Sequence, residues 1–163
     1  MSSSLKNLSN FTSSIPRLQG IRIGLVVAEW NDQVTFALRD GAIQTLKQAG
    51  VTDEHILVTY VPGSFELPLG AQFFLENNPV DAVICIGCVI QGETPHFTFI
   101  SEAVAQGIMR LNLDYNRPVI FGVLTTLTLE QALERSGGKH GNKGDEAAFT
   151  ALKMLALQHQ HEI

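Results

Sequence analysis

Residues 81–90 read DAVICIGCVI, the most apolar run in the chain, and residues 91–97, QGETPHF, follow it directly. Valine and isoleucine dominate the run, and polar residues do not alternate with apolar ones. This composition is typical of a strand that is buried on both faces of a parallel sheet. The polar residues that follow indicate that the chain leaves the core here. It enters either a plain loop or a functional site.

Three more segments share this apolar composition, and helical periodicity follows each of the four. The strands are expected at 21–27 (IRIGLVV), 55–61 (HILVTYV), 81–87 and 117–124 (RPVIFGVL). The helices are expected at about 33–49, 66–77, 96–113, 128–137 and 142–158. An alternating order of this kind calls for helices on both faces of a parallel sheet. The sequence therefore predicts an α/β fold, a flavodoxin-like doubly wound sandwich with a four-stranded parallel sheet.

Local signals predict where several helices begin and end. Asn31 or Asp32 is expected to cap the first helix, and Gly50 is expected to close it. Thr94 is expected to cap the third helix, and Thr128 the fourth. These positions place each helix start directly after a strand.

Length and charge limit the possible function classes. A chain of 163 residues predicts one domain, here 21–163, preceded by an N-terminal arm over 1–20 that is rich in serine and asparagine. The net charge of −5 argues against nucleic-acid binding. The start lacks a secretory signal pattern, and the apolar runs are too short to cross a membrane. We therefore expect a cytoplasmic protein without a membrane or nucleic-acid partner.

Cys85 and Cys88 have the CxxC spacing of redox and metal sites. They lie in a predicted strand, where residues three apart point to opposite faces of the sheet. Two such thiols cannot hold one metal ion together, and a structural zinc needs four ligands. The pattern therefore favours two small buried side chains over a redox or metal site.

In doubly wound folds, ligands bind beyond the carboxyl ends of the strands. Trp30 follows the first strand, either as a packing residue or as a stacking surface for a flat heterocycle. Ser64, Phe65 and Glu66 follow the second, where Glu66 either complements a helix dipole or contacts a ligand. The loops contain neither GxGxxG nor a Walker motif, which excludes dinucleotide and P-loop sites.

The third strand is followed by Gly92, Thr94, Pro95 and His96. Gly92 permits a sharp turn, and Pro95 suits the first position of a helix. Free amides at a helix start form an anion site. His96 is either a solvated polar residue or an acid/base group for chemistry near neutral pH.

Lysine and arginine are absent between Lys47 and Arg110, an interval that contains most of these loops. A phosphorylated ligand would need its countercharge from elsewhere. The segment 135–144, RSGGKHGNKG, offers Arg135, Lys139 and Lys143. It is either a solvated connection or a phosphate clamp, and a symmetric neighbour could supply that clamp.

Together these motifs resemble one family, the 6,7-dimethyl-8-ribityllumazine synthases. The resemblance rests on VVAEWND, VPGSFELPLGA, DAVICIGCVIQGETPHF, PVIFGVLTT and EQALERSGGKHGNKG, and it covers about residues 21–157. It implies condensation of 5-amino-6-(D-ribitylamino)uracil with 3,4-dihydroxy-2-butanone 4-phosphate, which releases phosphate and water. This is the penultimate step of riboflavin biosynthesis. The resemblance implies neither a metal nor an organic cofactor.

The resemblance also implies roles for single residues. The pyrimidine would be bound by Trp30, Ser64, Phe65, Glu66 and the main chain of Cys88, Val89 and Ile90. The phosphate would be bound by Glu93 and Thr94 and by Arg135 of an adjacent subunit. Phe121 would be a further contact from that subunit, and Lys143 a further contributor to the site. His96 would transfer protons. The chain departs from the family pattern at Gln91, where a basic residue is common, and at Thr98, where an acidic one is usual.

Family members form pentamers with active sites between subunits, and many build shells of sixty chains. The short segment SGGKHGNKG favours the shell. The resemblance implies that the N-terminal arm adds a strand to a neighbouring subunit. It also implies riboflavin synthase as a partner.

Two other function classes share parts of this sequence pattern. A binding module for flavin-like heterocycles would keep the pocket without turnover, but it would not need the phosphate clamp of Arg135 and Lys143. A receiver domain would need an aspartate at the end of the third strand, and ICIGCVI contains none. These residues favour the enzyme.

Overall fold

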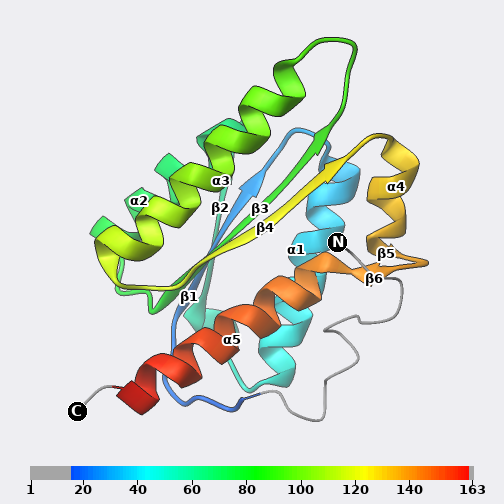
Figure 1. Cartoon of the computed structure of the whole chain (residues 1–163). Coiled ribbons are helices and arrows are strands. Elements are labelled where there is room, and N and C mark those ends of the chain that lie inside the picture. Colours follow the sequence, from blue (N-terminus) through cyan, green and yellow to red (C-terminus); the bar gives the residue numbers. More distant parts are fainter. Residues whose placement is uncertain (1–15, 162–163) are drawn as a thin grey trace.

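Four parallel strands form the centre of the fold, in the order β2-β1-β3-β4 (Figure 1). The computed structural model of the chain describes residues 16–161. The strands are β1 (Ile23–Ala28), β2 (Ile56–Val61), β3 (Ala82–Ile90) and β4 (Val119–Thr126). The predicted flavodoxin-like α/β sandwich is confirmed, because helices alternate with these strands and cover both faces of the sheet.

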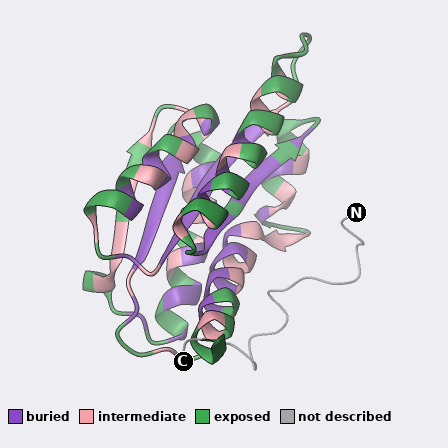
Figure 2. Cartoon of the chain, turned by 60° about the vertical axis from the view of Figure 1, so that its left-hand side comes forward, coloured by how far each residue is buried: buried purple, intermediate pink, exposed green. Residues whose placement is uncertain are grey.

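Each face of the sheet packs against its own set of helices (Figure 1). One face carries α1 (Asp32–Gln48), α4 (Leu129–Glu134) and α5 (Lys143–His161), and the other carries α2 (Leu67–Asn77) and α3 (His96–Tyr115). Figure 2 shows buried residues concentrated on the sheet and exposed residues on the outer sides of the helices. Two apolar cores therefore lie on either side of a fully buried β1.

Short elements complete the chain. They are the 3₁₀ turns η2 (Asp53–His55) and η3 (Ser64–Glu66), and the antiparallel strands β5 (Ser136–Gly138) and β6 (Gly141–Asn142). The sequence predicts a helix up to Gly137, but α4 ends at Glu134 and the chain then turns into the β5–β6 hairpin. Gly137 and Gly141 both adopt positive φ there (114° and 76°), which is why glycine suits this hairpin.

The predicted helix ends are partly confirmed. Gly50 closes α1 at φ 96°, and the Thr128 side chain accepts a hydrogen bond from the Gln131 amide (3.2 Å). The prediction that Thr94 caps the third helix is wrong. The residue preceding α3 is Pro95, whose carbonyl accepts bonds from the Thr98 and Phe99 amides, and no side chain caps this end.

The third strand is longer than predicted, because it continues past Gly87 to Ile90. Residues 88–90 are paired with β4, and the last pair joins Ile90 to Thr126. On its other side, β3 is paired with β1 only as far as Ile86, opposite Val27. The carboxyl end of β3 thus has one open edge.

The two cysteines point to opposite faces of β3, as predicted. Cys85 packs in the core against α2 and α3, while Cys88 packs in the core on the α1 and α5 side. Within residues 16–161, no group of three or more His, Cys, Asp or Glu side chains is placed to hold a metal ion.

The predicted N-terminal arm lies largely outside the described residues, and so does the strand that it is expected to add to a neighbour. None of the helices in the described part of the chain combines the length and the apolar character that crossing a membrane requires.

Close packing between α1 and α5 generates the first prediction. A β-carbon at Gly144 would lie 1.8 Å from the Leu38 carbonyl oxygen, so the two helices would have to separate. We expect Gly144→Ala to lower the free energy of unfolding by about 3 kcal/mol, measured by urea denaturation. In the control Gly92→Ala, the new β-carbon meets no atom within 4 Å, and the change should stay within about 0.5 kcal/mol. Equal losses in both variants would contradict the packing argument.

Candidate active site

The chain reverses its direction across the sheet between β1 and β3. From β1 it moves outward to β2, and from β3 it moves outward to β4 on the opposite side. The helices that follow β1 and β3 therefore leave toward opposite faces, α1 to one and α3 to the other (Figure 1). Such a switch point opens a crevice at the carboxyl ends of the strands, which is where doubly wound folds bind ligands.

A pocket of about 610 Å³ lies at this switch point. Eight of the predicted site residues line it: Trp30, Ser64, Phe65, Glu66, Cys88, Val89, Ile90 and His96. They come from the ends of β1, β2 and β3 and from the start of α3. The structure thus brings together in one cavity residues that are up to 66 positions apart in the sequence.

The open edge of β3 forms one wall of this pocket. Beyond Ile86 the strand has no partner in β1, while the Gln91 amide still donates to the Thr126 carbonyl on the β4 side (2.9 Å). The direction of backbone groups alternates along a strand. The amide and carbonyl of Ile90 consequently face the open side, where they can pair with the polar edge of a ring.

Ser64 is a buried residue of the pocket lining and lies in the 3₁₀ turn η3. The turn packs so closely on β3 that a β-carbon at Gly87 would lie 2.6 Å from the Ser64 hydroxyl oxygen. Glycine at position 87 is therefore what lets η3 approach the strand. The same turn carries Phe65 and Glu66 to the pocket.

Two aromatic side chains stand at the mouth of the pocket and are largely exposed, Trp30 by 74% and Phe65 by 57%. The Trp30 loop is tied to the end of β2, because the Glu29 amide donates to the Val61 carbonyl (2.8 Å) and the Trp30 amide to the Pro62 carbonyl (3.1 Å). A packing role for Trp30 within its own chain does not fit this exposure. An exposed aromatic on a fixed backbone suits stacking on a flat ligand.

His96 is the first residue of α3, and its exposed side chain lines the pocket. Glu93 and Thr94 are exposed residues of the loop between β3 and α3, and they do not belong to the pocket lining. The lining contains the acidic Glu66 but neither lysine nor arginine. The cavity is therefore suited to a heterocycle, and it lacks the countercharge for a phosphate.

The other three predicted residues lie elsewhere. Phe121, Arg135 and Lys143 line a second pocket of about 700 Å³, which is formed by β4, α3 and α5. Phe121 is opposite Cys85 in the middle of the β3–β4 pair, whereas the first pocket begins at Cys88. A single chain thus presents two separate groups of predicted site residues.

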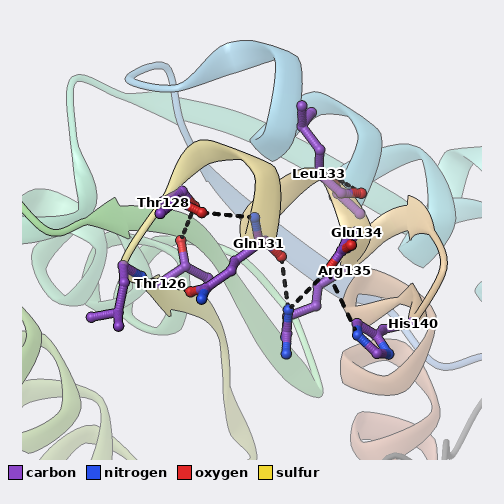
Figure 3. A network of polar contacts seen from close by, with 9 residues as sticks. Thr126, Thr128, Gln131, Leu133, Glu134, Arg135 and His140 are labelled. Atoms are coloured by element: carbon purple, nitrogen blue, oxygen red, sulfur yellow. Dashed lines mark hydrogen bonds and ion pairs between the residues drawn. The ribbon is translucent and has the colours of Figure 1, made fainter.

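Neighbouring carboxylates and a carbonyl hold both basic side chains of the second pocket. Arg135 Nη1 donates to the Gln131 carbonyl (3.0 Å) and lies 3.9 Å from Glu134 Oε2 (Figure 3). Lys143 Nζ contacts both carboxylate oxygens of Glu146 at 2.9 Å. The Lys143 amide also donates to the Arg135 carbonyl (2.9 Å), which joins the two residues through the main chain.

The sequence pattern does not identify Asn31 as a pocket residue, because it suggests only a helix cap. In the structure Asn31 precedes α1 without making a side-chain cap, and it lines the pocket instead. Its left-handed backbone (φ 61°) is a conformation that asparagine adopts more readily than most residues. A lone asparagine before a helix gives no signal that separates these two roles.

Comparison with known proteins agrees with this geometry. Residues 20–159 match the family model described as 6,7-dimethyl-8-ribityllumazine synthase. Proteins of that name share 59% identity in Cytophaga hutchinsonii, over 96% of this chain and 98% of the relative, and 54% in Porphyromonas gingivalis, over 97% and 99%. The Thermus thermophilus protein of that name is 46% identical over 89% and 92%. This chain belongs to the 6,7-dimethyl-8-ribityllumazine synthase family.

The family match covers all the strands and helices that the structure describes, apart from the last two residues of α5. It includes both pockets. The predicted family and its α/β fold are confirmed by these comparisons and by the strand order.

The buried thiols generate the second prediction. Burial raises the pKa of Cys88 to about 11 and that of Cys85 to about 12. At pH 8, only about one Cys88 thiol in a thousand is then the reactive thiolate. We expect iodoacetamide to modify the folded protein far more slowly than free cysteine, and urea unfolding should restore the ordinary rate. Rapid labelling of the folded protein would contradict the burial of both thiols. In Cys88→Ala, any labelling that remains is assigned to Cys85.

Proposed function

We propose that this chain catalyses the reaction for which its family is named. It would condense 5-amino-6-(D-ribitylamino)uracil with 3,4-dihydroxy-2-butanone 4-phosphate to 6,7-dimethyl-8-ribityllumazine, with release of phosphate and water. The observation that carries the proposal is the pocket at the switch point, which gathers eight of the predicted residues in a chain of this family. This is the penultimate step of riboflavin biosynthesis.

In the proposed complex, the pyrimidine ring stacks on Trp30 at the pocket mouth. The main chain of Cys88, Val89 and Ile90 forms the wall that binds the ring, and within it the Cys88 amide and the amide and carbonyl of Ile90 face the open edge of β3. Ser64, Phe65 and Glu66 contact the ribityl chain and the ring from η3. The exposed aromatic and the unpaired strand edge support this arrangement.

The proposed chemistry needs positioning and proton transfer. The amine of the pyrimidine forms an imine with the carbonyl of the second substrate and releases water. Phosphate then leaves by elimination. The ribityl-bearing nitrogen attacks the remaining carbonyl, and loss of a second water closes the ring and gives the lumazine. His96, at the rim of the pocket, is the group proposed to move protons between these steps.

We further propose that the site is completed by a neighbouring subunit. Glu93 and Thr94 face the phosphate from one chain, and Phe121 and Arg135 of the next chain close the site, with Lys143 as a further contributor. Large exposed apolar side chains support an assembly, among them Phe99 (66%), Met109 (60%) and Leu113 (76%) on α3. Within this proposal the assembly is a pentamer, and twelve pentamers form a shell of sixty chains.

The proposal also covers the domain bounds, the cellular compartment and a protein partner. The domain is proposed to span 21–163, with the arm over 1–20 adding a strand to the neighbouring subunit. The reaction is placed in the cytoplasm, and riboflavin synthase, which would use the product, remains a predicted partner.

The third prediction tests the reaction itself. Purified protein mixed with both substrates should generate the absorbance and fluorescence of the lumazine, and each substrate alone should not. A protein that binds the pyrimidine but forms no product, under conditions where the Cytophaga hutchinsonii relative is active, would support a heterocycle-binding module instead.

The fourth prediction concerns the phosphate. Arg135→Ala should raise the KM for the butanone phosphate by roughly 10- to 100-fold, the size of a lost charge-assisted hydrogen bond, with little change in the KM for the pyrimidine. Lys139→Ala is the matched control, because Lys139 is an exposed cation of the same hairpin region outside the second pocket. Equal rises for both substrates would contradict a phosphate role for Arg135.

Mixing two impaired variants tests whether the site is shared. His96→Ala and Arg135→Ala chains, unfolded together and reassembled in equal amounts, should recover activity, because about a quarter of the shared sites would then contain both native residues. If both residues served the same chain, every site would lack one of them. No recovery in reassembled particles of normal size would therefore contradict the shared site.

A further inference from the structure

Asn31 joins two parts of the chain that both line the pocket, the start of α1 and the end of β3. Its carbonyl begins α1, because it accepts bonds from the Val34 amide (2.9 Å) and the Thr35 amide (3.0 Å). Its side-chain amide Nδ2 donates to the Cys88 carbonyl of β3 at 2.9 Å. The bond spans 57 positions of the sequence and lies within the pocket lining.

This bond is made where the sheet itself stops joining β1 to β3. The last pair between these strands is Val27 with Ile86, so Cys88 lies beyond the ladder. Because backbone groups alternate in direction, the Cys88 carbonyl points to the same open side as the amide and carbonyl of Ile90. The Asn31 side chain thus occupies one acceptor of the wall and leaves the Ile90 groups to a ligand.

The same bond bears on Trp30, the residue that precedes Asn31. On one side, the Trp30 amide is held by the Pro62 carbonyl at the end of β2. On the other side, the Asn31 side chain is held by β3. The backbone under the exposed indole is therefore fastened between the two strands that flank β1.

We propose that Asn31 is a positioning residue of the active site. It ties the Trp30 loop to the open edge of β3, and so it sets the separation between the stacking indole and the main-chain groups that read the ring. It acts through Trp30 and Cys88 rather than on the reacting atoms. The identity of the ring as the pyrimidine substrate rests on the proposed function, whereas the tie itself rests on geometry alone.

Two substitutions separate the hydrogen bond from the backbone conformation. Asn31→Gly permits positive φ and removes the donor. Asn31→Asp keeps the shape of the side chain and its tolerance of the left-handed region, but a carboxylate cannot donate. Asn116 supplies matched controls, because it is the other non-glycine residue with positive φ among those described (48°) and follows α3 at the opposite end of the sheet.

The first readout needs no substrate. Trp30 is the only tryptophan in the chain, so time-resolved fluorescence anisotropy of the folded protein reports its motion directly. We expect a larger amplitude of fast depolarisation in Asn31→Gly and Asn31→Asp, and no change in Asn116→Gly and Asn116→Asp. Unchanged Trp30 motion in both Asn31 variants would overturn the proposal, whether or not the chain turns over its substrates.

The second readout is kinetic. The KM for the pyrimidine should rise roughly fivefold in both Asn31 variants, the size of one net hydrogen bond, and the KM for the butanone phosphate should stay constant. Thermal unfolding measures any general loss of stability in the Asn31 variants. The Asn116 variants show how much stability the same substitutions cost at another residue with positive φ. Equal rises in both KM values at matched stability would indicate a merely structural asparagine and would overturn the proposal. Absence of turnover in the parent chain would overturn the proposed function, and the anisotropy result would still decide the role of Asn31.

Discussion

The unequal pairing of β3 is the constraint on which the site depends. The strand is paired with β4 as far as Ile90 but with β1 only as far as Ile86, so its last residues keep one edge without a strand partner. Backbone amides and carbonyls in such a position need hydrogen bonds from elsewhere. Asn31 supplies one, and the rest of the edge is available to a ligand. The pocket therefore lies where backbone groups of β3 have no hydrogen-bond partner in the neighbouring strand.

The fold could be predicted from the sequence because its strands are buried on both faces, which leaves unbroken apolar runs such as 82–90. The positions of most candidate residues followed, since parallel strands bring their carboxyl ends to one edge. The predicted bound of the third strand, Gly87, came too early, because the apolar run reaches Ile90 and pairing with β4 extends to the same residue. The β5–β6 hairpin was also missed, since glycines that suggest helix ends serve equally well in a tight turn.

Side-chain caps of helices are also difficult to predict from the sequence alone. Thr128 caps its helix, while Thr94, in a similar position, does not. Thr94 precedes Pro95, and a residue before proline is pushed out of the helical region, but sequence alone does not reveal which residue starts the helix. Asn31 shows the same ambiguity between a cap and a cross-strand bond. The role of such a residue depends on which hydrogen-bond partner the tertiary structure places within reach. For Asn31 this partner is the Cys88 carbonyl.

Charge is the reason to propose that a neighbouring subunit completes the site. The switch-point pocket has no lysine or arginine in its lining, and the two candidate cations belong to a different cavity of the same chain. They are held there by Glu134 and Glu146, whose pairs are partly exposed. Partly exposed pairs of this kind contribute little free energy, so a phosphate can compete with these carboxylates for the cations. In the proposed assembly, a phosphate bound in another subunit's pocket would meet two cations that folding has already ordered. Binding would then not carry the entropic cost of ordering these side chains.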